Sequence, residues 1–214
     1  MNVVPRIVSI VEGDGEVSAV PILIRRIGED LGLYVEGYRA ILTKRDRFPR
    51  LAHERETRMQ MARINVGESG AILVLLDADG EPPCTHGITQ CLLGAELLES
   101  VHSLAAGLPV AVVLAQCEYE SWFIAAAPSL VATGDLVPGT ETPDNPDSIR
   151  GAKEWLGARM LNRPNYSPTA DQARLTKQFD MQMACERSPS FARCYDEIAR
   201  LIQAVSGASV TADQ

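Results

Sequence analysis

An unbroken apolar run at residues 71–76 (AILVLL) is the feature that most constrains how this chain can fold. The run lies between Gly70 and Gly80 and is followed at once by Asp77 and Asp79. A run of this length without a polar interruption predicts a strand covered on both faces, as strands in parallel sheets are. Ligands of such sheets gather beyond the carboxyl ends of the strands, so we expect the two aspartates at a functional edge.

Asp77 and Asp79 are candidate ligands for a divalent cation. Residues i and i+2 of an extended chain point the same way, so both carboxylates are expected to face one ion. Mg²⁺ binds few protein oxygens and keeps water or phosphate in the rest of its shell. The same Asp-x-Asp pattern also occurs in ordinary solvated turns, where local backbone geometry favours Asp and Gly. The motif alone leaves both interpretations open.

Two further predicted strands also end in acidic residues. Residues 6–11 are typical of a short strand, and Glu12 follows it in a glycine-rich turn. Residues 109–115 are typical of a buried strand that ends shortly before Glu120. A core requires buried strands, but it does not require Glu12, Asp77 and Glu120 at one edge. Clustered like charges repel unless a cation or a raised pKa relieves them, so a metal site is the simplest explanation.

The order of the predicted elements indicates the fold class. Strands are expected at residues 6–11, 33–42, 71–76 and 109–115, and helices at 17–31, 50–64, 89–101 and 121–127. This alternation predicts an α/β fold with a mainly parallel sheet flanked by helices. Residues 1–130 are expected to form this core. Residues 131–214 are expected to form an irregular connection and a helical C-terminal extension, with helices at 148–161 and 190–205, packed on the core.

The charge balance gives no general attraction for nucleic acid. The net charge of the 214 residues is −8, from 20 basic and 28 acidic side chains. Such a protein has no global basic field, although a local basic patch can still contact phosphate. The chain has one basic cluster, and the simpler interpretation is that it forms a solvated loop and helix face and does not contact phosphate. Its members are Lys44, Arg45, Arg47, Arg50, Arg55, Arg58 and Arg63.

Several features favour a cytoplasmic protein that does not enter a membrane. No apolar run is long enough to span a bilayer, and the N-terminus lacks the basic start and cleavage site of a signal peptide. The five cysteines are odd in number and irregularly spaced, which argues against a disulfide framework. Cys84, His86 and Cys91 lack the paired spacing of a zinc site.

The motifs resemble those of the Toprim superfamily, the metal-binding fold of topoisomerases and primases. The segment VEGDGE at residues 11–16 is similar to its glutamate motif, and LLDADG at 75–80 to its paired-aspartate motif. Within the superfamily, the chain most resembles a bacterial Toprim-like family related to the overcoming-lysogenisation-defect nucleases. In that family a strand ends in Glu-x-Glu, as at 117–123 (CEYESWF). Segments at 166–177 and 187–191 resemble it as well, so the resemblance covers nearly the whole chain.

The resemblance implies a carboxylate site for phosphodiester hydrolysis. Glu12 would be a general acid/base or a metal ligand, and Asp77 and Asp79 would bind Mg²⁺ or Mn²⁺. Glu16 and Glu120 would complete a second metal position. Two metals would activate water and stabilise both the attacking and the leaving oxygen of phosphodiester cleavage.

The resemblance also implies partners. Lys177 is similar to a recurrent basic residue of the family and would contact a phosphate. The alternative interpretation is that Lys177 is an ordinary surface lysine without this role. Nucleic acid would be the substrate, and an ATPase would associate with the protein. The leading hypothesis is therefore a magnesium-dependent Toprim nuclease that acts with a partner.

Two other functions compete with the nuclease hypothesis. A non-catalytic regulatory or partner subunit of a bacterial defence-like system would keep the scaffold, and the acidic charge balance favours it. A phosphatase with Asp77 as its nucleophile is the third. Phosphatases of the haloacid-dehalogenase type carry Asp-x-Asp after the first strand, followed by Thr or Val. Here the motif comes later and precedes Gly80 and Glu81, so the structural context of such a phosphatase is missing.

Overall fold

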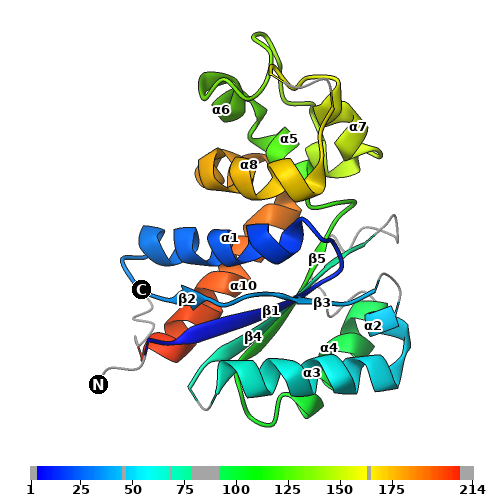
Figure 1. The fold of residues 1–214 in the computed structure, drawn as a ribbon, viewed down its shortest axis with the longest axis vertical. Helices are drawn as coiled ribbons and strands as arrows, with labels where there is room; N and C mark the ends of the chain where they lie inside the picture. The colour runs from blue at the N-terminus through cyan, green and yellow to red at the C-terminus, as the bar shows by residue number, and fades with distance from the viewer. Residues whose placement is uncertain (1–3, 45–46, 68, 79–91, 163–164, 208–214) are drawn as a thin grey trace.

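The chain folds around a parallel sheet, as seen in a computed structural model that describes residues 4–44, 47–67, 69–78, 92–162 and 165–207. Within these ranges the sheet has five strands in the order β2-β1-β4-β5, and β3 also pairs with β1. All of these pairings are parallel (Figure 1). The strands are β1 (Arg6–Val11), β2 (Glu36–Gly37), β3 (Ile41–Leu42), β4 (Ala71–Asp77) and β5 (Val110–Ala115). The predicted α/β fold with a mainly parallel sheet is confirmed.

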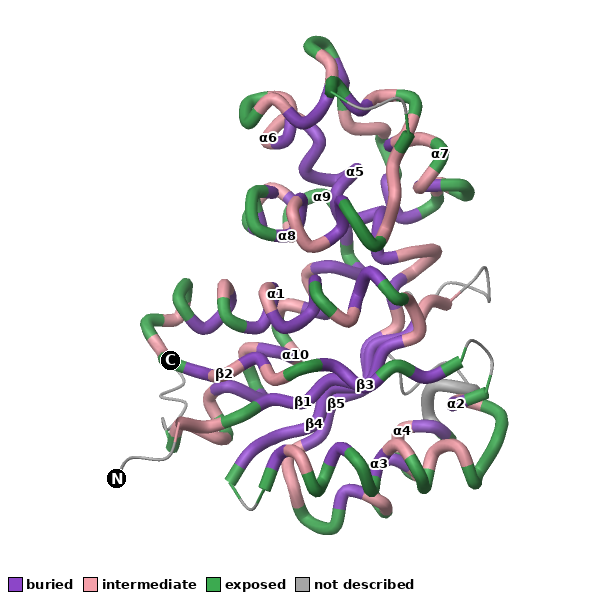
Figure 2. Tube along the Cα trace, viewed as in Figure 1, coloured by how far each residue is buried: buried purple, intermediate pink, exposed green. Residues whose placement is uncertain are grey.

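Helices cover both faces of the sheet. One face carries α1 (Glu16–Asp30) and α10 (Pro189–Ser206), and the other carries α2 (Arg47–Arg50), α3 (Ala52–Val66) and α4 (Leu92–Leu104) (Figure 1). Side chains of β4 alternate between two cores: Leu73 and Leu75 pack in the core with α1, whereas Ile72 and Val74 pack in the core with α3. Figure 2 shows the result, a buried sheet with exposed residues on the outer sides of the helices.

Two short strands replace the single strand expected at residues 33–42, so that prediction is wrong. β2 lies beside the start of β1, whereas β3 lies beside its end, where Val11 aligns with Leu42. Gly37 marks the break between them. A Cβ atom on Gly37 would stand 2.2 Å from the carbonyl oxygen of Pro21, so the close approach of this segment to α1 requires glycine.

The C-terminal part contains more and shorter helices than expected. They are α5 (Ser121–Ala125), α6 (Ala127–Ala132), the 3₁₀ helix η2 (Pro146–Ser148), α7 (Ala152–Gly157), the π-helix η3 (Pro168–Gln172), α8 (Ala173–Gln178) and α9 (Met181–Arg187). The long helix expected at 148–161 is wrong. Gly151 has a left-handed backbone with φ of 73° before α7, and beyond α7 Met160 pairs with Leu136 in an antiparallel bridge.

α10 connects the C-terminal part to the sheet. It packs against β4 and β5, and its residues Cys194, Ile198 and Leu201 are buried in the same core as α1. The boundary expected at residue 130 stays a prediction. Among the helices that the structure describes, none combines the length and the apolar character needed to cross a membrane. The cytoplasmic location likewise stays a prediction.

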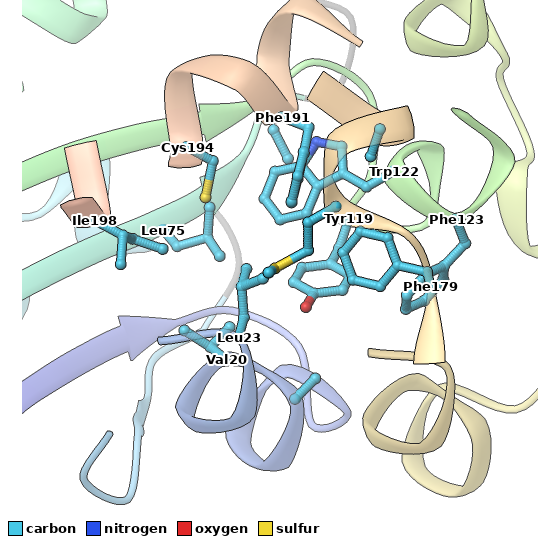
Figure 3. Close-up of a cluster of buried hydrophobic side chains, with 14 of the residues drawn as sticks. Val20, Leu23, Leu75, Tyr119, Trp122, Phe123, Phe179, Phe191, Cys194 and Ile198 are labelled. Atoms are coloured by element: carbon cyan, nitrogen blue, oxygen red, sulfur yellow. The ribbon is translucent and has the colours of Figure 1, made fainter. Parts of the chain in front are cut away.

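A cluster of five aromatic rings joins the segment after β5 to the C-terminal helices (Figure 3). Tyr119 packs against Trp122 and Phe123, with ring centroids 4.6 and 5.5 Å apart. Phe179, which follows α8, lies 5.6 Å from Phe123 and 5.3 Å from Phe191. All five side chains are buried. Residues that follow β5 are therefore held in place by residues from the far end of the chain.

A buried carboxylate ties η2 to the start of α10. Asp147 accepts hydrogen bonds from the Ser188 hydroxyl at 2.7 Å and from the backbone N–H of Ser190 at 2.9 Å. The Ser190 hydroxyl also donates to Asp147, at 3.0 Å, and accepts from the indole N–H of Trp122 at 2.9 Å. The network satisfies the indole N–H of Trp122, which the aromatic cluster buries.

Replacement of Asp147 by asparagine is expected to lower the free energy of unfolding by about 2 kcal/mol, because an amide nitrogen replaces a buried oxygen that accepts hydrogen bonds. Urea denaturation followed by circular dichroism measures the change. Asp144→Asn is the matched control, since Asp144 is exposed in the same segment; its change is expected to stay within about 0.5 kcal/mol. Equal stabilities for the two variants would contradict the structural role of Asp147.

Candidate functional site

The turn after β1 places two glutamates next to the end of β4. Glu12 Oε2 accepts a hydrogen bond from the backbone N–H of Asp77 at 3.4 Å, which joins the ends of the two strands. Glu16 begins α1, and its carboxylate accepts from the backbone N–H of Gly13 at 3.3 Å. Glu12 is partly exposed, whereas only 4% of Glu16 is exposed. The Glu12 side chain therefore reaches the backbone at the end of β4, whereas the grouping of the Glu12 and Asp77 carboxylates around a metal ion stays a prediction.

Glu16 carries the clearest sign of crowded negative charge. Burial, together with the nearby carboxylates of Glu120 and Glu12, raises the pKa of Glu16 to about 7, although hydrogen bonds from the backbone at Gly13 and Glu12 act to lower it. Two strand ends thus contribute to one electrostatic site, because Glu120 follows β5 and Glu12 follows β1. Without a cation, this site stabilises a proton on Glu16.

The acids after β5 are engaged by two residues from later in the chain. Lys153 Nζ on α7 lies 3.0 Å from Glu118 Oε1 and 3.5 Å from Glu120 Oε2. The Tyr166 hydroxyl donates to Glu120 Oε1 at 3.0 Å. Both oxygens of Glu120, of which 1% is exposed, are therefore already bound by protein donors. Glu120 therefore fixes the positions of the Lys153 ammonium group and the Tyr166 hydroxyl relative to each other.

Glu118 offers an oxygen that Glu120 does not. Its Oε2 atom is buried and has no hydrogen-bond partner within the part of the chain that the structure describes. An orphaned carboxylate oxygen of this kind is costly unless a cation or another donor satisfies it. Glu120 was the predicted ligand of this pair, whereas the geometry also makes Glu118 a candidate ligand.

Lys153 brings positive charge into the site. Burial lowers the pKa of this ammonium, but the carboxylates of Glu120 and Glu118 outweigh that effect and raise its pKa, and Asp77 adds to the rise. Lys153 therefore stays protonated and lies within electrostatic reach of acids at two strand ends. Sequence reasoning missed both Lys153 and Tyr166, because no motif marks the former and the role of the latter depends on a contact with a distant residue.

A cavity of about 450 Å³ adjoins these two residues. Lys153 and Tyr166 line it together with Glu154, Gly157, Ala158 and Asn165. Its size is that of a small-ligand pocket. A larger cavity of about 750 Å³ lies between α3 and the segment before β5, where Gly67 and Leu108 precede strands, and its lining includes none of the site carboxylates. Of these two cavities, only the smaller one is lined by residues that contact the site carboxylates, namely Lys153 and Tyr166.

The π-helix η3 packs against the glutamate turn. A Cβ atom on Gly15 would stand 2.0 Å from Gln172 Oε1 and 2.6 Å from the carbonyl oxygen of Pro168, so only glycine permits this approach. π-helical turns occur frequently at functional sites. Since Tyr166 precedes η3 by two residues, one short segment contacts both the turn after β1 and Glu120 after β5.

The remaining predicted residues lie elsewhere. Asp79 is outside the described residues, as are Cys84, His86 and Cys91. Lys177 is exposed near the end of α8, and no contact given for it reaches the carboxylates, so its role stays a prediction. Within the described ranges, no group of three or more acids, histidines or cysteines stands close enough to hold a metal ion. The donors present are nevertheless carboxylate oxygens, the type that Mg²⁺ and Mn²⁺ prefer.

Comparison with known proteins gives one match. A family model described as "Domain of unknown function (DUF4276)" matches residues 11–199. No curated protein and no solved structure matches the chain. The matched region runs from the last residue of β1 into α10, and it includes the turn with Glu12 and Glu16 as well as Lys153 and Tyr166. The chain therefore belongs to the DUF4276 family.

Proposed function

We propose that the protein hydrolyses phosphodiester bonds in nucleic acid with the help of Mg²⁺ or Mn²⁺. The observation that carries this proposal is the crowding of Glu12, Glu16 and Glu120 at the carboxyl edge of the sheet, where burial and like charge raise the pKa of Glu16 to about 7. A fold gains no stability from such crowding, so a cation that neutralises it is the natural ligand.

The residues present offer the type of oxygen that a hard cation prefers. Glu12 follows β1, Asp77 ends β4 and the orphaned Oε2 of Glu118 lies after β5, although no three acids of the described residues stand close enough to hold one ion together. Asp79 would add a further carboxylate if it faces the same way as Asp77. When bound, Mg²⁺ would polarise a phosphoryl oxygen and lower the pKa of water.

The residues of the chain itself have separate roles in this proposal. Lys153, held by Glu118 and Glu120, would bind a non-bridging oxygen of the phosphate through its ammonium group. Tyr166 orients Glu120 through its hydroxyl and thereby orients Lys153. Glu16, whose pKa is about 7, is partly protonated at neutral pH and would lose this proton when a cation binds. The cavity beside Lys153 and Tyr166 would accept the group attached to that phosphate.

The resemblance to Toprim-like proteins supports the same function. It adds two expectations that the geometry does not address, an ATPase partner and a second metal position. In the described residues Glu120 is occupied by Lys153 and Tyr166. We therefore propose that Glu120 positions Lys153. A second metal ion is expected only from the resemblance to Toprim-like proteins.

A non-catalytic partner or regulatory subunit is the second candidate. The observation that favours it is the ion pair of Lys153 with Glu118 and Glu120, which already compensates part of the negative charge without a metal. A stable complex with an ATPase, together with no hydrolysis under any divalent metal, would support this candidate. Hydrolysis by the isolated chain would exclude it.

Two substitutions test the hydrolytic function. Asp77→Asn and Glu12→Gln are each expected to lower hydrolysis of plasmid and single-stranded nucleic acid at least about 100-fold, since a few kcal/mol of lost transition-state stabilisation correspond to two or more powers of ten. Gel analysis of the products with Mg²⁺ or Mn²⁺ measures this loss.

Asp14→Asn is the matched control for these two variants. Asp14 lies in the same turn and carries the same charge, but its side chain is exposed. Its activity is expected to equal that of the unchanged protein. If Asp77→Asn cleaves as fast as the Asp14→Asn control, the proposed site is not the site of hydrolysis.

The charge crowding predicts how stability depends on pH. The pKa of Glu16 is higher in the folded chain than in the unfolded chain, so its contribution to stability is full at low pH and is lost as pH rises toward 7. In EDTA, Glu16→Gln removes this loss and is expected to stabilise the protein at pH 8 by up to about 3 kcal/mol, with little effect at pH 4. Urea unfolding across this pH range measures the difference.

Glu29→Gln provides the comparison for the pH experiment. Glu29 lies on the same helix but is exposed. Its variant is expected to follow the pH profile of the unchanged protein. Parallel profiles for Glu16→Gln and Glu29→Gln would show that Glu16 titrates like an exposed glutamate and would remove the electrostatic basis of the metal site.

A further inference from the structure

Basic residues begin at the same edge of the sheet as the carboxylates. Leu42 of β3 aligns with Val11 of β1, and the backbone N–H of Thr43 donates to the carbonyl of Val11 at 2.8 Å. Lys44 is the next residue, so it lies opposite the start of the turn that contains Glu12. Neighbouring strands are about 5 Å apart, which places the backbone of Lys44 close to this turn. Figure 1 shows β3 and α2 at the end of the sheet where β1 enters α1.

The helix that follows is held rigidly in place. Phe48 of α2 is fully buried in the core beneath α3. The Arg55 guanidinium donates to the carbonyl oxygens of Phe48 at 3.3 Å and Pro49 at 2.8 Å, and to the Ser100 hydroxyl on α4 at 3.1 Å. α2 is thereby fastened to both α3 and α4. A helix of four residues would not hold its own geometry, so these contacts are what fix its surface.

The side chains on this fixed surface carry positive charge toward solvent. Lys44, Arg47 and Arg50 are exposed. Among the described residues, the acid Glu54 on α3 is bonded to Arg58 at 2.8 Å and to Thr43 at 3.1 Å, and Arg47 adds only electrostatically to the lowering of its pKa. These exposed side chains form a locally positive surface in a chain of net charge −8, and such a surface attracts a ligand of negative charge.

We propose that Lys44 and Arg47 bind the phosphate backbone of a polynucleotide on the β3 side of the carboxylate site. This inference rests on the proposed function, because it takes the polymer to continue from a phosphate held near Lys153 and Asp77. It makes a polynucleotide the preferred substrate, since a mononucleotide or a small phosphate ester has no further phosphates for Lys44 and Arg47 to bind. It also assigns a role to basic residues that otherwise form a solvated face.

Binding and cleavage are measured separately to test this inference. The double variant Lys44→Ala/Arg47→Ala is made in the full-length chain and also combined with Asp77→Asn, which removes cleavage if the proposed function holds. Fluorescence anisotropy of a fluorescein-labelled 20-nucleotide single-stranded DNA, and of the RNA of the same sequence, is followed in Mg²⁺ at several salt concentrations. Hydrolysis of the same oligonucleotides is compared with hydrolysis of bis(4-nitrophenyl) phosphate.

Loss of two phosphate contacts is expected to weaken oligonucleotide binding by about 10- to 30-fold at 0.1 M salt. The slope of log K against log salt is expected to become shallower by about 1.4, as for two fewer contacts to a single strand. kcat/KM for the oligonucleotide should fall by a similar factor, and hydrolysis of bis(4-nitrophenyl) phosphate should stay unchanged. The matched control Arg63→Ala/Arg187→Ala removes the same charge from exposed residues elsewhere and is expected to change none of these values.

The outcomes separate this inference from the proposed function. Equal effects of the two double variants, or no binding of either oligonucleotide by the unchanged chain, would overturn the inference. Cleavage that persists at its original rate in Lys44→Ala/Arg47→Ala would overturn it while the proposed function stands. If the unchanged protein hydrolyses nothing and Lys44→Ala/Arg47→Ala selectively loses binding, the result would support nucleic-acid binding by Lys44 and Arg47 and would overturn the proposed hydrolysis.

Discussion

The burial of Tyr119 between two glutamates is the constraint on which the candidate site depends. Its ring is fully buried against Trp122 and Phe123, and its hydroxyl lies 3.0 Å from Thr176 Oγ1 on α8. Because this residue cannot turn outward without emptying the aromatic cluster, the carboxylates on either side of it have little freedom. The cluster also contains rings that follow α8 and begin α10. The position of the β5 acids is therefore a product of the whole chain and not of the strand alone.

The same architecture explains how so many carboxylates can stand together in a partly buried place. Burial alone opposes the charge of Glu16 and Glu120, and raises the pKa of both. Lys153 and Tyr166 reduce the cost at Glu120, since one supplies a positive charge and the other a hydrogen bond. Among the described residues, neither of these two makes a comparable contact with Glu16, which is partly protonated near neutral pH because its pKa is about 7. Protein groups therefore compensate the negative charge at Glu120 more fully than at Glu16.

Local pattern was sufficient for some of these features and not for others. The strands β1, β4 and β5 were predictable because each is short and rich in apolar, mainly β-branched or aliphatic residues, and parallel pairing then brings the Glu12 side chain to the backbone of Asp77. The division of residues 33–42 into two short strands was not predictable, because it depends on the close approach of Gly37 to the carbonyl oxygen of Pro21 in α1. Lys153 and Tyr166 lie 35 and 46 residues from the glutamates that they bind. Contacts at such separations follow from tertiary packing, which no periodicity in the sequence records.

The edge of the sheet combines both signs of charge for a topological reason. In a parallel sheet every strand ends on the same side, so the residues after β1, β3, β4 and β5 meet whatever their sequence separation. Acids follow β1, β4 and β5, whereas Thr43 and the exposed Lys44 follow β3. At 0.1 M salt the Debye length is about 10 Å, so the net charge of −8 acts weakly on a ligand at this edge compared with the groups around it. A polyanion that reaches the edge therefore meets Lys44, Arg47 and Lys153 beside acids that a cation can neutralise, and the acidic composition of the chain as a whole does not decide whether it binds.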